Sequence, residues 1–282
     1  MNIALISPYP DLHAFGIRTI SACLKREGHD VNLFLLPKQF TERYENRTLN
    51  EIVNLSKKSN LIGISLMTNF FDNAIQITQK LKENSDIPIL WGGIHPTIRP
   101  EECLNYADMV CIGEGEEALV ELSNKMEDGH YYHDVPGIWF KDKEIIITNP
   151  IQPLTQSLDH IPFPDYDDRT HFILNNGCIQ KMDMKLLNRH LGGTYLTMPT
   201  RGCPFRCAYC CNNTINKMYP NQKPLRKRSI DNIIKELIEA KKLLPFIDRI
   251  IFDDDAFLSL SVNEIAELCE KYKNNVSLPL VI

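Results

Sequence analysis

The sequence predicts an α/β protein in which a parallel β-sheet is covered by helices on both faces. Short apolar runs recur along the first part of the chain, at residues 3–7, 31–36, 61–67, 87–93 and 109–115. Between these runs, apolar residues return at helical spacing, as Ile17, Ile20 and Leu24 do after the first run. Strands this apolar are typical of parallel sheets, because both faces of such a sheet are buried. Ligands of such sheets bind beyond the carboxyl ends of the strands.

Length, composition and charge limit the functions that the chain can have. With 282 residues, 43% hydrophobic and 24% charged, the sequence has room for one large domain or two ordinary ones. The net charge is −5, from 31 basic and 36 acidic residues, which argues against binding to nucleic acid or to an anionic membrane. The basic run Lys223, Arg226, Lys227 and Arg228 is interpreted as a solvated flank before a helix rather than as a phosphate site.

The N-terminus and the cysteines indicate a cytoplasmic protein. The first residues have no basic stretch followed by a long apolar run, and no segment approaches the length of a membrane span. Five of the nine cysteines stand singly, which does not fit a disulfide framework. The sequence therefore predicts a soluble, cytoplasmic protein without a membrane span.

The character of the sequence changes in the middle and then returns to strand and helix alternation. We expect a first domain at 1–135, then a β-hairpin and a proline-rich linker at 136–193, and a second domain at 194–282. The second domain begins with a strand and a cysteine-rich loop, and a helix follows behind Ser229 as N-cap. Two βα units and a strand make only part of a barrel, so we expect this fold to continue beyond Ile282.

The cysteine-rich loop has the spacing of an iron–sulfur site. Cys203, Cys207 and Cys210 follow the pattern C-x3-C-x2-C directly after a predicted strand. A zinc site needs a fourth ligand, but no second close pair exists, and Cys211 leaves the backbone on a different side from Cys210. The order of spacings also differs from that of a bacterial ferredoxin. Three cysteines on a four-iron cluster leave one iron open to bind a small molecule.

This loop, with Tyr209 just before the last cysteine, resembles that of the radical S-adenosylmethionine (SAM) superfamily. The resemblance implies that the three cysteines hold a [4Fe-4S] cluster, whose open iron binds SAM and whose electron cleaves it to a 5′-deoxyadenosyl radical. Tyr209 would then lie near the adenine. The later run "FDDDAF" is similar to that of the cobalamin-associated branch, which makes Asp254 and Asp255 candidate SAM ligands. Alternatively, these carboxylates cap the following helix.

The first domain carries several motif residues at the ends of predicted strands. They are Asp11, His13 and Gly16 in D-x-H-x-x-G, Ser65, Gly92 with Gly93, and Gly113 with Gly115. Together they resemble the Rossmann-like (flavodoxin-like) cobalamin-binding domain, although Met67 replaces the leucine of its S-x-L. The resemblance implies that the small residues lie against the cobalamin tail, with Gly113 and Gly115 in a tight turn near it. His13 would be the lower axial cobalt ligand or, alternatively, a solvent-exposed loop histidine.

The two resemblances together indicate a cobalamin-dependent radical SAM enzyme, with a Rossmann-like domain followed by the N-terminal part of a (β/α) barrel. Its reaction would be methyl transfer to an unactivated carbon or phosphorus, or ring formation or rearrangement. The substrate would be a small molecule of natural-product or lipid type, and flavodoxin or ferredoxin would supply electrons. Two alternatives stay open: a radical SAM enzyme that does not use cobalamin, and a non-catalytic sensor of cobalamin or of the cluster.

Overall fold

The computed structural model describes residues 1–282, which divide into two compact units. Unit 1 comprises Met1–Gln152 and Asp167–Met182. Unit 2 comprises Pro153–Tyr166 and Asp183–Ile282. The chain therefore leaves unit 1, contributes a short segment to unit 2, returns to unit 1 and then completes unit 2.

Unit 1 is built on a nine-stranded sheet with the order β7-β6-β5-β4-β3-β1-β2-β8-β9. Its strands are β1 (Asn2–Ser7), β2 (Asp30–Leu35), β3 (Leu61–Ser65), β4 (Ile89–Gly92), β5 (Met109–Cys111), β6 (Ile138–Asp142), β7 (Ile145–Ile147), β8 (His171–Asn175) and β9 (Cys178–Lys181). The adjacent strands β5, β4, β3, β1, β2 and β8 are parallel to one another. At the edges of the sheet, β6, β7 and β9 each pair in antiparallel fashion with the strand before them in the chain. The predicted parallel sheet of five buried strands is thus confirmed.

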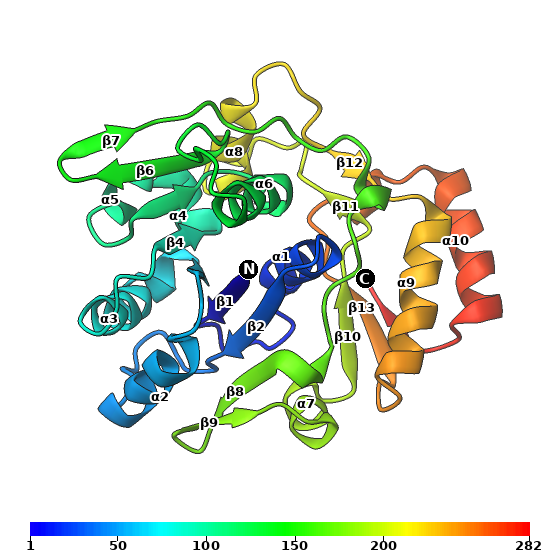
Figure 1. Ribbon diagram of the computed structural model, residues 1–282. Helices are drawn as coiled ribbons and strands as arrows, with labels where there is room; N and C mark the ends of the chain where they lie inside the picture. The colour runs from blue at the N-terminus through cyan, green and yellow to red at the C-terminus, as the bar shows by residue number, and fades with distance from the viewer. The chain divides into compact units, whose positions relative to one another are not determined.

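Helices cover both faces of this sheet, as predicted. They are α1 (Phe15–Arg26), α2 (Asn46–Ser56), α3 (Phe71–Lys82), α4 (Ile94–Ile98), α5 (Pro100–Cys103) and α6 (Glu116–Glu127), with 3-10 turns η1 (Thr68–Phe70) and η3 (Asp168–Thr170). Helix α1 packs beside α6 on one face, and α2 packs beside α3 on the other (Figure 1). Ile17 and Leu24 of α1 are buried, so the apolar spacing in the sequence marks the face that contacts the sheet.

Two hairpins within the interval 136–193, which was expected to be a hairpin and a linker, add strands to both edges of the sheet. The predicted hairpin exists as β6 and β7, but β6 pairs with β5 and extends the sheet. A second hairpin, β8 and β9, pairs with β2 at the other edge. Its turn is Asn176–Gly177, with φ of 50° and 78°. Asn-Gly is the strongest short-range hairpin signal, and its two positive φ values are those of a two-residue turn.

The two compact units divide the chain after Gln152, Tyr166 and Met182, whereas boundaries at 135 and 193 were expected. Residues after 135 belong to the sheet of unit 1, whereas the proline-rich stretch Pro153–Tyr166 belongs to unit 2. Glu51 of α2 accepts a hydrogen bond from the Ile179 amide at 2.6 Å, and Thr48 donates one to the Gly177 carbonyl at 3.2 Å. These contacts fix the second hairpin onto a helix distant in sequence, which local patterns do not reveal.

Unit 2 has a three-stranded parallel sheet with the order β10-β13-β14, and a two-stranded ribbon of β11 and β12. Its elements are η2 (Leu158–His160), α7 (Met184–Leu191), β10 (Thr194–Thr197), β11 (Thr200–Arg201), α8 (Cys211–Met218), β12 (Arg226–Lys227), α9 (Ile230–Leu243), β13 (Arg249–Phe252), η4 (Phe257–Ser259), α10 (Val262–Asn275) and β14 (Leu280–Val281). Helices α9 and α10 pack against each other. Ser229 caps α9 as predicted, since its hydroxyl accepts from the Asn232 amide at 3.1 Å.

Three residues of the basic run before α9 have partners within unit 2, which corrects their interpretation as a solvated flank, whereas Lys223 is exposed. Arg226 is 6% exposed and donates to the Thr155 carbonyl at 2.9 Å. Arg228 forms an ion pair with Glu236, a carboxylate that is 1% exposed. Lys227 pairs with a carboxylate of α10 at 3.0 Å. Buried charges require such partners, so these side chains hold secondary-structure elements together.

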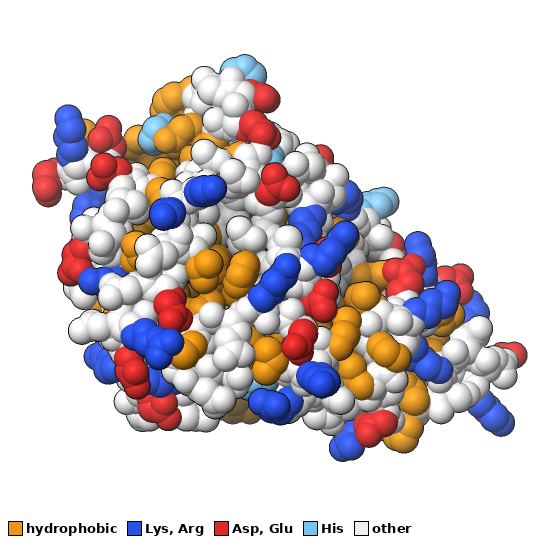
Figure 2. Space-filling view, turned by 60° about the horizontal axis from the view of Figure 1, so that its bottom comes forward, with side chains coloured by type: hydrophobic (Ala, Val, Ile, Leu, Met, Phe, Trp, Pro, Cys, Tyr) orange, Lys and Arg blue, Asp and Glu red, His pale blue; other side chains and the backbone are white.

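The surface carries charges of both signs. On the face shown in Figure 2, basic and acidic side chains are interspersed. Ion pairs at several surface positions account for part of this mixing, for example Arg43 with Asp72 at 3.1 Å. No helix of the chain has the length and apolarity required to cross a membrane.

Candidate functional site

The predicted ligand site of unit 1 lies at the carboxyl ends of its parallel strands. The strand order reverses at β1, because β2 lies on one side of it and β3 on the other. In open α/β sheets this switch point is where ligands bind. The loops after β1, β3, β4 and β5 carry the motif residues, so the fold brings these segments to one edge of the sheet.

The loop after β1 holds Asp11 and His13 as a hydrogen-bonded pair. The Asp11 Oδ1 atom accepts from the His13 amide at 2.9 Å and lies 2.6 Å from His13 Nδ1. Burial by itself raises the pKa of Asp11, but the hydrogen bonds from His13 outweigh it and lower that pKa below its usual range. His13 is 8% exposed, so it is a buried residue and not an exposed loop histidine. Because Nδ1 is paired with Asp11, a metal would have to bind Nε2.

Residues at the start of α1 and directly before it shape this loop. Arg18 is fully buried and donates its Nε hydrogen to the Leu12 carbonyl at 2.9 Å. Ala14 adopts a left-handed conformation with φ of 36°, which turns the chain into the helix. At Gly16, a Cβ atom would meet nothing within 4 Å. The glycine is therefore not required by packing within the chain, and its surroundings leave room for a ligand.

The loop after β3 contributes Ser65 to the same edge. The Ser65 hydroxyl oxygen lies 3.5 Å from the Tyr9 hydroxyl, which comes from the loop after β1. Burial raises the pKa of Tyr9 to about 12, so its phenol is neutral at physiological pH. Two residues after Ser65, the side chain of Met67 is 42% exposed. This loop thus presents a hydroxyl and an apolar side chain.

Gly92 and Gly93 follow β4 and differ in what they allow. Gly93 has a φ of 101°, and a Cβ there would lie 2.7 Å from the Leu66 carbonyl oxygen. Only glycine fits this position, because backbone approaches backbone. At Gly92, by contrast, a Cβ would meet only the Cys111 Cβ, at 3.7 Å. The fold therefore requires glycine at position 93, whereas packing within the chain would allow a side chain at position 92.

Two buried polar residues of α4, which the sequence analysis did not single out, connect these loops. Thr97 donates its hydroxyl to the Gly93 carbonyl at 2.8 Å and accepts from the Gly113 amide at 3.1 Å. His95 Nδ1 lies 3.1 Å from the Thr68 hydroxyl oxygen. The loops after β3, β4 and β5 are therefore linked through one short helix. The signal that could have identified them is the presence of two polar side chains in the otherwise apolar segment "GGIHPT".

Gly113 and Gly115 have different places in the loop after β5. Gly113 has a φ of 86°, as the expected tight turn requires. Gly115 precedes α6, and a Cβ there would lie 3.2 Å from Ile20 Cδ1 and 3.4 Å from Cys111 Sγ. The structure thus gives Gly115 a role in packing α6 against α1, in place of the turn expected for it.

The cysteine loop of unit 2 joins β11 to α8. Cys203 is 8% exposed, Cys210 is half-buried, and Cys207 is exposed; all are free thiols. No group of three or more histidine, cysteine or carboxylate side chains has the arrangement of a formed metal site. The Cys210 amide donates to the Cys207 carbonyl at 3.1 Å, which tightens the loop. The loop therefore carries three thiols on a short segment, which is the donor set that iron–sulfur clusters use.

The beginning of this loop is held firmly. Gly202 has a φ of 78°, and a Cβ there would lie 2.0 Å from the Pro224 carbonyl oxygen. The pairing of β11 with β12 brings these backbones together. From the other side, Asn216 of α8 donates to the Cys203 carbonyl at 2.8 Å. Cys203 is consequently fixed, whereas Tyr209 further along is 93% exposed.

The acidic run after β13 lies against the cysteine loop. Asp254 accepts from the Thr200 amide at 2.6 Å, from the Thr200 hydroxyl at 2.7 Å and from the Ala256 amide at 2.8 Å. Asp255 is exposed and accepts from Asn212 at 2.8 Å. The Cys203 sulfur lies 4.0 Å from the Asp255 carbonyl oxygen. The predicted neighbourhood of these two aspartates and the first cysteine is present, but their carboxylates have different partners.

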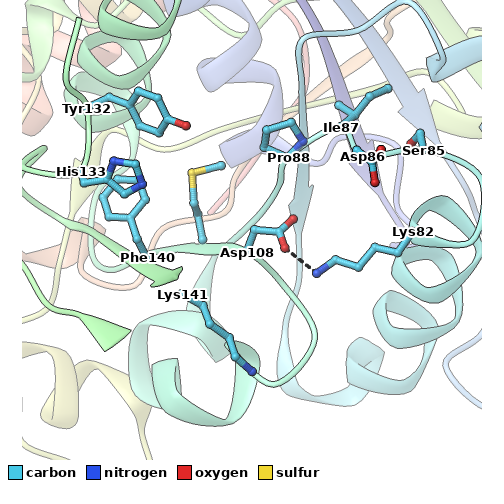
Figure 3. Close-up of a pocket in the computed structure, with 11 residues that line it drawn as sticks. Lys82, Ser85, Asp86, Ile87, Pro88, Asp108, Tyr132, His133, Phe140 and Lys141 are labelled. Carbon is cyan, nitrogen blue, oxygen red and sulfur yellow. Dashed lines mark hydrogen bonds and ion pairs between the residues drawn. The ribbon is translucent and has the colours of Figure 1, made fainter. Parts of the chain in front are cut away.

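A cavity of about 430 Å³ lies at the opposite, amino-terminal edge of the sheet of unit 1 (Figure 3). Its lining is Lys82, Ser85, Asp86, Ile87, Pro88, Asp108, Met109, Tyr132, His133, Phe140 and Lys141. Lys82 Nζ lies 2.5 Å from Asp108 Oδ1, and Asp108 Oδ2 accepts from the Ile89 amide at 2.9 Å. These contacts tie α3 to the starts of β4 and β5. No predicted site residue lines this cavity. The candidate site is therefore placed at the carboxyl-terminal edge of the sheet, where the loops carry the motif residues.

A known family model matches part of the chain, and curated proteins are similar to most of it. Residues 1–123 match the model of the B12 binding domain family. An uncharacterized methyltransferase of Pyrococcus horikoshii is 28% identical over 245 residues, which are 84% of this chain and 47% of that protein. The anaerobic magnesium-protoporphyrin IX monomethyl ester cyclase of Synechocystis is 26% identical over 72% of this chain and 38% of that protein. The chain thus spans less than half the length of these relatives.

The fold of the whole chain is also that of a solved structure. The radical SAM methyltransferase TsrM of Kitasatospora setae, solved with its substrate tryptophan and a SAM analogue, gives a TM-score of 0.74 at 18% identity, over 99% of this chain and 54% of that one. A second structure of TsrM, with cobalamin and a [4Fe-4S] cluster, gives 0.70 at 19% identity, over 99% of this chain and 53% of that one. The predicted fold class, a Rossmann-like domain followed by part of a barrel, is confirmed.

Proposed function

We propose that the chain is the cofactor-binding part of a cobalamin-dependent radical SAM enzyme, because residues 1–123 match the model of the B12 binding domain family and the chain shares the fold of TsrM. The observation that carries the proposal is the joint presence of a loop with three free thiols and of a sheet edge whose small residues the fold does not all require. The first feature supports SAM cleavage, and the second supports cobalamin binding.

The residues of unit 1 fit a bulky cofactor at the carboxyl edge of the sheet. Gly16 and Gly92 both leave space that a side chain would fill. Asp11 holds Nδ1 of His13, so the imidazole is oriented to offer Nε2 to a cobalt ion. Ser65 adds a hydroxyl that can accept or donate a hydrogen bond. In this proposal Gly93 and Gly113 shape the loops, and Gly115 packs helices.

The residues of unit 2 fit a [4Fe-4S] cluster with one open iron. Cys203 would be the buried ligand, and Cys207 and Cys210 would come from the more exposed part of the loop. When bound, such a cluster supplies the electron that cleaves SAM, and cobalamin supplies a cobalt ion that carries a methyl group. Tyr209 and Asp255 are exposed beside the thiols, and we assign them to the adenine and to the polar groups of SAM.

The proposed reaction is methyl transfer to an unactivated centre of a small molecule in the cytoplasm, with electrons from flavodoxin or ferredoxin. Ring formation is the second candidate reaction, because the relatives include a cyclase as well as a methyltransferase. The test is anaerobic reconstitution of the chain with iron, sulfide and cobalamin, followed by reduction in the presence of SAM. Formation of 5′-deoxyadenosine with bound corrinoid supports the proposal. Cleavage without corrinoid binding would favour an enzyme that does not use cobalamin, and bound cofactors without cleavage would favour a sensor.

A pair of glycine variants tests the cobalamin site. Gly92→Ala should leave thermal unfolding unchanged but weaken cobalamin binding, because the new methyl group has room in the protein and occupies the space left for the ligand. Gly93→Ala should lower stability by about 1–3 kcal/mol, because its positive φ and the Leu66 carbonyl both oppose a side chain. Calorimetry and equilibrium dialysis with cobalamin measure the two effects. If Gly92→Ala binds cobalamin as the wild type does, the site lies elsewhere.

A histidine variant tests the axial ligand separately. His13→Ala should remove the absorption features of histidine-ligated cobalamin, because Nε2 is the atom assigned to cobalt. His130→Ala, at an exposed loop position of the same unit, is the control and should leave the spectrum unchanged. An unaltered spectrum in His13→Ala would show that the buried Asp11–His13 pair only shapes the loop.

A further inference from the structure

We propose that Asp254 is a positioning residue that fastens the cysteine loop to the end of β13, and that it is not a ligand of SAM. This role rests on the proposed cluster site. The carboxylate lies between two backbone segments that are far apart in sequence, the strand β11 before Cys203 and the turn after β13. It accepts hydrogen bonds from both segments and so holds one against the other.

The carboxylate of Asp254 is nearly saturated by donors of its own chain. An ionised carboxylate offers about four acceptor positions. Thr200 occupies two of them, with its amide on Oδ2 and its hydroxyl on Oδ1, and the Ala256 amide occupies a third. Thr200 itself is 1% exposed. Hydrogen bonds from buried donors to a charged acceptor are the strong ones, so Asp254 is committed to this contact.

The neighbouring Asp255 differs in each of these respects. Its side chain is exposed and accepts a hydrogen bond from the side chain of Asn212. Its carbonyl oxygen faces the Cys203 sulfur at 4.0 Å. The two adjacent aspartates thus divide the work, with Asp254 fixing the loop and Asp255 presenting its carboxylate outward.

The hydrogen bonds of Asp254 with Thr200 and Ala256, which together form a clamp, restrict the position of Cys203, the first cysteine ligand. Thr200 stands three positions before Cys203, and the intervening Gly202 is pressed against the Pro224 carbonyl. The Asn216 side chain holds the Cys203 carbonyl from α8. With Asp254 in place, Cys203 is held from β12, from β13 and from α8. A ligand fixed in this way needs no further ordering when a cluster binds.

Rates of cluster loss and SAM binding distinguish a positioning residue from a ligand. In the reconstituted chain, Asp254→Asn should lose iron to a chelator roughly tenfold faster than the wild type, because a charged acceptor of buried donors is lost. Thr200→Val should show a smaller increase, and Thr200→Ser, which keeps both donors, should restore the wild-type rate. The dissociation constant of SAM should stay unchanged. Asp253→Asn is the matched control, since this neighbouring aspartate is exposed.

Two results would overturn the proposal. One is a weakened SAM affinity in Asp254→Asn with an unchanged rate of iron loss, which is the behaviour of a SAM ligand. The other comes from the chain without iron, in which Asp254→Asn should accelerate hydrogen exchange of the Thr200 and Ala256 amides; equal exchange would show that there is no clamp. The second measurement needs no cluster, so a wild type that takes up no iron would reject the proposed function and leave the clamp to be decided by exchange.

Discussion

Cys207→Ala is expected to abolish cluster assembly and, with it, the cleavage of SAM. Cys207 is exposed, so its thiol contributes little to the fold, and its loss should leave thermal unfolding unchanged. Loss of even an outer partner of a metal ligand costs about 10–100-fold in metal affinity or activity, and loss of a ligand should cost more than about a hundredfold. The measurements are iron and sulfide content after anaerobic reconstitution, and the yield of 5′-deoxyadenosine.

The control for this experiment is the adjacent thiol. Cys211 is also exposed and free, but it is the first residue of α8 and lies outside the C-x3-C-x2-C spacing. Cys211→Ala should retain the cluster and the cleavage of SAM. Equal losses in the two variants would show that four thiols bind a metal ion, as in a zinc site, and would contradict an open iron. A Cys207→Ala variant with a full cluster would contradict the assignment of the loop.

The features that the sequence predicted well are those encoded locally. Strand β1 was visible because the run 3–7 is apolar on both faces, and the cap of α9 because Ser229 directly precedes a helical apolar repeat. The spacing of the three cysteines also placed them on one short loop between a strand and a helix, which the structure has between β11 and α8, whereas their role as cluster ligands stays a prediction. Gly92 and Gly93 were expected to lie against a cobalamin tail, which stays a prediction; the close approach that the structure shows is that of Gly93 to the Leu66 carbonyl.

The features that were missed depend on contacts between distant segments. The hairpin of β8 and β9 joins the sheet because β8 pairs with β2, far earlier in the chain, and Glu51 of α2 also accepts the Ile179 amide. The basic run was interpreted as solvated, because nothing near it in the sequence indicates that Arg226 donates to the carbonyl of Thr155, far earlier in the chain. Asp254 resembled its neighbours in "FDDDAF", and only the fold shows that Thr200 occupies it. Residue type indicated chemistry here, but partners decided the role.

Arg228→Met is expected to destabilise unit 2 by about 3–5 kcal/mol, because it leaves the Glu236 carboxylate buried without its cation. Two hydroxyls, of Tyr195 at 2.7 Å and Thr197 at 3.0 Å, would remain as the donors to Glu236. Urea unfolding followed by far-UV circular dichroism measures the loss. Both tryptophans of the chain, Trp91 and Trp139, lie in unit 1, so the fluorescence transition should stay in place as an internal control.

The double variant Arg228→Met with Glu236→Gln decides whether the uncompensated charge is the cause. The introduced amide would keep an oxygen to accept the Tyr195 hydroxyl, while the buried negative charge would be absent. Replacement of a buried ion pair by neutral groups is often tolerated, so the double variant should be more stable than Arg228→Met alone. If it is no more stable, the damage comes from lost packing of the arginine side chain, which lies 5.6 Å from the ring centre of Phe163. The backbone amide of Arg228 donates a hydrogen bond to the Pro199 carbonyl at 3.0 Å, directly before Thr200. A change in the position of Arg228 would therefore also affect the strand that leads into the cysteine loop.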